Sequence, residues 1–135
     1  DLQQHLAPLI GDEVITSVAL YKHPIYSWQL TSFLLYHAFV VFQTDCWWWS
    51  IEKDAEGLTL QRSKNRHEVV NKRRCQSRAA DCELIMTDEA QYPLKTLADM
   101  LYASDVVRSE YSAATSNSKH FAQLIYNKLA IRTSW

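Results

Sequence analysis

The strongest pattern in the sequence is a nearly continuous apolar run between positions 33 and 42. The run reads FLLYHAFVVF, is aromatic or β-branched at most positions, and holds His37 near its middle. A surface helix would place polar residues every three or four positions, and this run does not. The pattern therefore predicts a buried central strand over Phe33–Phe42 that carries one histidine.

Two further strands are predicted to follow as a meander. After a polar turn at Gln43–Cys46, the aromatic-rich segment Trp47–Lys53 predicts the second arm of a hairpin. Asp54–Gly57 is a second turn, in which the glycine can take a positive φ angle. Leu58–Arg62 alternates apolar and polar residues, as a third strand would.

The remaining elements are predicted from shorter patterns. Val14–Tyr21 fits a strand or a short helix, and Cys82–Thr87 fits one more short strand. Pro93 stands before Leu94–Tyr102, whose apolar residues recur at three- and four-residue steps and predict an amphipathic helix. These elements predict an α+β fold in which an antiparallel β-meander packs against helices.

A last amphipathic helix is predicted from about Ser118 to Ile131. Its apolar positions follow helical spacing, and Ser116 and Asn117 are suitable caps for its first turn. This prediction places residue 118 at the start of a helix.

Composition favours a single domain. The chain has 135 residues, 47% of them apolar, and contains two glycines and three prolines, which leaves no low-complexity linker. We therefore expect residues 1–135 to form one domain. Because the chain begins at Asp1 without a methionine, we expect it to be cut from a longer protein. No apolar run reaches the roughly 18 residues that a membrane-spanning helix needs.

Cysteine usage favours a reducing, intracellular compartment. Cys46, Cys75 and Cys82 are odd in number, and no pair has the spacing of a zinc knuckle or a redox loop. The simplest interpretation is three free thiols. We expect no cofactor and no metal, because no two histidines have the four-residue helical spacing of many zinc sites.

Positive charge is concentrated in one segment, although the net charge is only −1. Seven of the 14 basic residues fall between positions 62 and 78, where Glu68 is the only acid. Such a segment can bind phosphate, nucleic acid or an acidic protein partner. A solvated loop is the preferred interpretation, since the segment lacks aromatic residues for stacking. The seven residues are Arg62, Lys64, Arg66, Lys72, Arg73, Arg74 and Arg78.

Two short blocks resemble a known enzyme family. The segment YSAATSNSKHF at positions 111–121 resembles the lecithin retinol acyltransferase-like family, whose hallmark is Asn-Cys-Glu-His-Phe. Tyr36–Phe42 resembles the catalytic histidine of that family and the apolar strand after it. The order of the blocks also agrees, and the resemblance covers about half of the chain. It implies a permuted papain-like core with the nucleophile at a helix N-terminus, and Ser118 stands where the family has its cysteine.

The chemistry of that family explains why these residue types belong together. A thiol attacks an acyl carbonyl as a thiolate, so a base must take its proton, and His37 is the candidate. A helix N-terminus at Asn117 and Ser118 would lower the pKa of a thiol and hold the oxyanion. His120 lies about 200° around the helix from position 118, and we expect it to be structural.

A hairpin centred between Thr44 and Asp45 supplies a partner for the histidine. In that register Glu52 lies directly opposite His37 on the same face and would orient the imidazole. A turn shifted by half a residue would instead place Ile51 or Lys53 opposite. The family usually has a second histidine at this place, so Glu52 is a departure from its pattern.

Serine at position 118 has three explanations. It is an engineered replacement that traps a thiol enzyme, which is the preferred one, or a natural loss of activity, or a true serine nucleophile. The last is the least favoured, because a hydroxyl is far less acidic than a thiol.

Three consecutive tryptophans complete the candidate site. On a strand, Trp48 faces one way and Trp47 and Trp49 the other, so one side is predicted to be core. We favour core packing, and the alternative is that one ring lines a substrate groove beside His37.

The sequence thus predicts a cysteine-type acyl hydrolase or acyltransferase acting through an acyl-thiol intermediate, inactive in this form because of Ser118. Its substrates would be acyl-lipids or esters. One alternative is a papain-like protease or deubiquitinase-type isopeptidase with the same site. Another is a natural, non-catalytic binding module that uses the basic segment.

Overall fold

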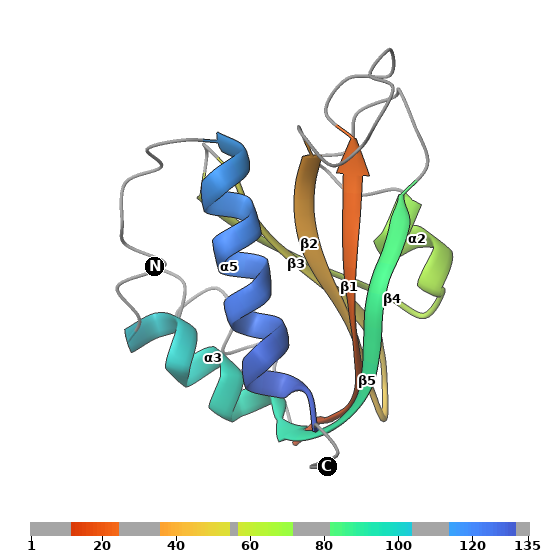
Figure 1. The fold of residues 1–135 in the computed structure, drawn as a ribbon. Coiled ribbons are helices and arrows are strands. Elements are labelled where there is room, and N and C mark those ends of the chain that lie inside the picture. The colour runs from red at the N-terminus through yellow and green to blue at the C-terminus, as the bar shows by residue number, and fades with distance from the viewer. Residues whose placement is uncertain (1–11, 25–35, 55–56, 72–81, 104–113, 132–135) are drawn as a thin grey trace, which may run out of the picture.

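The structure, a computed structural model, describes residues 12–24, 36–54, 57–71, 82–103 and 114–131. Within these residues five strands form one sheet and three helices pack against it (Figure 1). The strands are β1 (Val14–Pro24), β2 (Tyr36–Thr44), β3 (Trp48–Asp54), β4 (Gly57–Ser63) and β5 (Glu83–Pro93). The helices are α2 (Arg66–Asn71), α3 (Leu94–Ala103) and α5 (Ala114–Leu129).

The sheet is antiparallel throughout, with the order β4-β3-β2-β1-β5. Its first part is the predicted meander of β2, β3 and β4, joined by short turns. Gly57 has a φ of 124°, as expected for the glycine of the second turn. The predicted α+β class and the antiparallel meander packed against helices are confirmed.

Each face of the sheet has its own core. One face packs against α3 and α5, and its core includes Val40, Phe42, Trp49 and Ile125. The other face packs against α2 in a smaller cluster that contains Phe39 and Val41. Figure 1 shows α3 and α5 on one side of the sheet and α2 on the other. Successive residues of β2 therefore alternate between the two cores, because side chains alternate along a strand.

Several predicted strand boundaries change. Val14–Tyr21 proves to be part of a strand that runs to Pro24, and the short strand predicted over Cys82–Thr87 proves to be β5, which runs on to Pro93. Phe33–Leu35 lie outside the described residues. The helix predicted after Pro93 is α3, as expected.

The start of the last helix is the main correction to the predicted fold. Helix α5 begins at Ala114, so Ser116 and Asn117 lie inside it and do not cap it. Ser118 is consequently in the second turn. Ser118 is buried, as is Phe121 three residues later. Packing of these residues on the sheet can stabilise a preceding helical turn, although serine and asparagine favour cap positions.

Candidate functional site

The predicted histidine–glutamate pair is present. His37 Nε2 lies 2.7 Å from Glu52 Oε1, and Glu52 is only 1% exposed. His37 comes from β2 and Glu52 from β3, two rigid neighbouring strands. A buried carboxylate at this distance fixes the orientation of the imidazole.

The pair forms although the predicted hairpin register is wrong. The observed partners are Phe42↔Trp49 and Val40↔Ile51, a shift of two residues from the predicted register. Glu52 is therefore diagonal to His37 and not directly opposite it. Because the side-chain period of a strand is two, an even shift leaves both residues on the same face, and a shift of one would have separated them.

A second pair of ionisable side chains lies beside the first. His23 of β1 is the cross-strand partner of His37 and is buried. Its Nδ1 lies 3.4 Å from Sγ of Cys82, which is half-buried and also lies 3.5 Å from the carbonyl oxygen of Val70. Neither His23 nor Cys82 is predicted from the sequence to belong to a site. No motif surrounds either residue, and only the pairing of β1 with β2 and β5 brings them together.

These four groups share the α2 face of the sheet. Phe39, two residues after His37 on β2, belongs to the core under α2, so His37 lies on that face. Ala38, between them, belongs to the core under α5. Cys82 packs against the α2-face core as well. The four residues Glu52, His37, His23 and Cys82 will be called the α2-face cluster.

Ser118 lies on the opposite face. It belongs to α5, is 0% exposed, and its Oγ lies 3.5 Å from the backbone nitrogen of Ala38. The sheet itself separates this hydroxyl from the imidazole of His37. His37 and Ser118 therefore do not meet in one accessible cleft, contrary to the prediction. The reason is strand alternation: a helix that packs on Ala38 meets the face from which His37 points away.

The predicted oxyanion site at Asn117 and Ser118 does not lie at the N-terminus of the helix. The unpaired backbone donors of an α-helix belong to its first four N–H groups. With α5 beginning at Ala114, Ser118 is the fifth residue and lies beyond those groups. Asn117 precedes it inside the same helix, and His120 is exposed on it, in agreement with a non-catalytic role.

The three tryptophans alternate as predicted. Trp49 is buried in the larger core, where its ring stacks on Phe42 with centroids 6.1 Å apart, and Trp47 packs against the same core. Trp48 points to the other face and lines a pocket near α2. One ring of the three thus lies on the same face as His37.

Two cations of the basic segment lie against the ring of Trp47. The guanidinium of Arg62 lies 4.1 Å from the ring centroid of Trp47, and Nζ of Lys64 lies 4.0 Å from the same centroid. Lys64 also donates to the carbonyl of Cys46 at 2.7 Å. The order of residues within the basic segment does not reveal this partner, because the ring belongs to Trp47, just before β3.

Arg66 begins α2, so the expected solvated loop is wrong at this position. The remaining predicted contact residues, Lys72, Arg73, Arg74 and Arg78, lie outside the described residues.

The described part of the chain has neither a metal-binding cluster nor a membrane-spanning helix. No group of three or more histidine, cysteine or acidic residues there could hold a metal ion. None of its helices is both long and apolar enough to cross a membrane.

Comparison of the chain with protein-family models, curated proteins and solved structures found no match. The fold and the site therefore define an α+β domain with a cysteine–histidine and a histidine–glutamate pair on one face.

Proposed function

We propose that the chain is a thiol-dependent acyl hydrolase or acyltransferase that works on the α2 face of the sheet. Cys82 is the nucleophile of this proposal, and His23 is its base. The observation that carries it is the 3.4 Å separation of Cys82 Sγ and His23 Nδ1, directly beside the His37–Glu52 pair. Cys82 and His23 are the nucleophile and the base that acyl transfer needs, and Glu52, which is bonded to His37, adds a buried carboxylate to the same face.

The chemistry follows the usual order for a thiol. The proton of Cys82 passes to Nδ1 of His23, and the sulfur adds to the acyl carbonyl of an ester. The tetrahedral intermediate collapses to a thioester while the imidazolium returns its proton to the departing alcohol. Water or an acceptor alcohol then attacks the thioester and releases the thiol. The carboxylate of Glu52 favours positive charge on this face during the first step.

An acyl-adduct experiment tests the proposal. The chain is incubated with p-nitrophenyl butanoate, and the acylated residue is located by intact-mass and peptide mass spectrometry. We expect a butanoyl adduct on Cys82 that is lost in Cys82→Ser and slowed at least tenfold in His23→Gln. Cys46→Ser is the matched control, because Cys46 is an exposed thiol without a histidine partner among the described residues.

Position 118 supplies the second arm of the same experiment. The permuted papain-like arrangement suggested by the sequence places the nucleophile there. That arrangement predicts that the Ser118→Cys variant is acylated at residue 118. It also predicts that adding His37→Gln to this variant abolishes the acylation. The α2-face proposal expects Ser118→Ala and Ser118→Cys to leave the adduct on Cys82 unchanged. A peptide-based electrophile in place of the ester tests the protease alternative with the same variants.

A non-catalytic binding module is the second candidate function. The observation that favours it is Ser118 itself, a fully buried residue that contacts the backbone of β2 from inside a helix. This function predicts no adduct on residue 82 or 118 with any acyl donor in folded protein. That result would overturn the enzyme proposal.

A further inference from the structure

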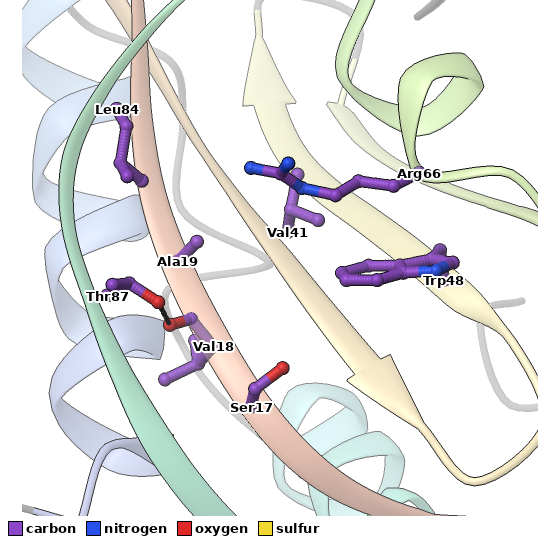
Figure 2. A pocket seen from close by; sticks show the side chains of 8 residues that line it. All are labelled: Ser17, Val18, Ala19, Val41, Trp48, Arg66, Leu84 and Thr87. Atoms are coloured by element: carbon purple, nitrogen blue, oxygen red, sulfur yellow. Dashed lines mark hydrogen bonds between the residues drawn. The ribbon is translucent and has the colours of Figure 1, made fainter.

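A pocket on the α2 face lies apart from the Cys82–His23 pair. It has a volume of about 360 Å³ and spans four strands from β5 to β3 (Figure 2). Volumes of about 300 to 1,000 Å³ are typical of small-molecule sites, which are mostly apolar with a few polar groups. None of the four residues of the α2-face cluster lines it.

The pocket is mainly apolar. Ala19 and Val41, from the neighbouring strands β1 and β2, are part of its lining. Trp48 lines it from β3, and Leu84 lines it from β5 (Figure 2). Leu84 is 49% exposed, so a large apolar side chain is left beside the opening. An apolar ligand would cover surface here that is otherwise in water.

Arg66 is the one charged residue of the lining. Figure 2 shows its side chain extending from α2 with the guanidinium toward Val41. Arg66 donates a hydrogen bond to the hydroxyl of Tyr21, and its guanidinium lies 5.8 Å from the ring centroid of Trp48. These contacts hold the side chain in place. Within the described ranges no carboxylate forms an ion pair with it.

We infer that this pocket binds a small organic carboxylate with an apolar body. The carboxylate would accept hydrogen bonds from the guanidinium of Arg66, whose planar fork matches two oxygens. The apolar body would lie along Ala19 and Val41, between Trp48 and Leu84. The charge of Arg66 decides the class of ligand, because no described residue pairs an acid with this cation, and a cation over an apolar surface is matched by an amphipathic anion.

This inference does not depend on acyl transfer. The pocket uses Arg66 and Trp48, whereas the proposed reaction uses Cys82 and His23. Cys82→Ser should abolish the acyl adduct and leave carboxylate binding unchanged. Failure of one proposal is therefore distinguishable from failure of the other.

Three probes test the ligand class on the full chain. Decanoate carries both chemical features, decanol carries only the chain, and acetate carries only the carboxylate. Isothermal titration calorimetry should detect decanoate with an affinity at least tenfold above that of decanol, and no binding of acetate. In ¹H–¹⁵N NMR spectra the indole signal of Trp48, assigned from Trp48→Phe, should shift with decanoate. Binding should weaken with added salt, since Arg66 is exposed and salt screens its charge.

Variants separate a specific site from a general loss of folding. Arg66→Met keeps an apolar stem and should weaken decanoate at least tenfold while leaving decanol unchanged. Ala19→Leu fills the pocket from β1 and should weaken both. Lys128→Met removes an exposed cation from α5 on the other side of the sheet and should change neither. Circular-dichroism melting checks that each variant is folded.

Two outcomes would overturn the inference. One is equal affinity of folded wild type and folded Arg66→Met for decanoate, which would show that the guanidinium plays no part. The other is a decanoate complex whose shifts spare Trp48, which would place the ligand elsewhere.

Discussion

Lys53 is a buried charged residue of β3. It lies on the same face of the strand as Trp49 and Ile51, so it faces the core under α5, and it is only 2% exposed. This burial lowers the pKa of its amine from the ordinary 10.5, because the charged form loses hydration. Folding removes the charged amine of Lys53 from water, and this loss of hydration lowers the free energy of unfolding.

The sign of the resulting pH dependence follows from linkage. Between the lowered folded pKa and 10.5, the unfolded chain binds more protons than the folded chain, so stability rises with pH. Above 10.5 both states are neutral and the penalty is absent. Below the folded pKa both states are protonated and the penalty is complete.

We therefore predict that Lys53→Met is more stable than wild type at pH 7. The advantage should shrink as the pH rises toward 10.5, because the wild-type amine is then neutral in both states. Urea unfolding of both proteins at pH 7 and pH 10 measures this difference. Lys128→Met, which removes an exposed lysine, is the control and should show a pH-independent difference near zero. A pH-independent advantage of Lys53→Met would contradict the prediction.

At the scale of elements, the β2–β3 turn is organised by one hydroxyl. Thr44 Oγ1 accepts hydrogen bonds from the backbone nitrogens of Cys46 and Trp47, at 3.1 and 2.9 Å. It donates to the buried carboxylate of Glu13 at 2.5 Å, and that carboxylate also accepts from Nε1 of Trp49 at 3.1 Å. The turn is thus tied to the segment before β1, and the hairpin register depends on this arrangement.

Thr44→Val should lower the free energy of unfolding by about 1 to 3 kcal/mol, because it leaves a buried carboxylate and two turn donors with fewer partners. Chemical denaturation measures the loss. The matched control is Thr16→Val, since the hydroxyl of Thr16 makes one exposed contact, to the carbonyl of Gln43 at 3.3 Å. Equal losses for the two substitutions would show that the hydroxyl of Thr44 has no special role.

At the scale of the whole molecule, the two faces of the sheet differ in chemical character as well as in size. The face under α5 and α3 carries most of the fully buried side chains. The face under α2 carries the smaller cluster, the ionisable pairs and the pocket. A sheet stabilised chiefly on one face can hold polar groups on the other, since their desolvation is offset by packing elsewhere.

Helix α5 is expected to contribute to stability through its side chains in the larger core. Ile125→Ala should destabilise the protein by about 2 to 5 kcal/mol, because it opens a cavity at a fully buried position between the helix and the sheet. Its neighbour Leu124 is 37% exposed, and Leu124→Ala should cost much less. Thermal or urea unfolding of the pair measures the contrast. Similar losses for both would mean that α5 does not pack as described.

The local elements could be predicted from the order of residues alone. The apolar run around His37, the turn at Gly57 and the alternation of the tryptophans were enough to predict β2, β3 and β4, because strand period and turn chemistry are local properties. The same-face placement of His37 and Glu52 also follows from sequence, since it depends only on an even offset across the hairpin.

Long-range packing determines which helix covers which face of the sheet. The side of the sheet that receives Ser118 is set by packing of α5 on Ala38 and its neighbours, a contact between residues eighty positions apart. The approach of Cys82 to His23, fifty-nine positions apart, depends on the placement of β1 between β2 and β5. Local patterns contain no information on either pairing, because both follow from long-range burial and not from the order of residues nearby.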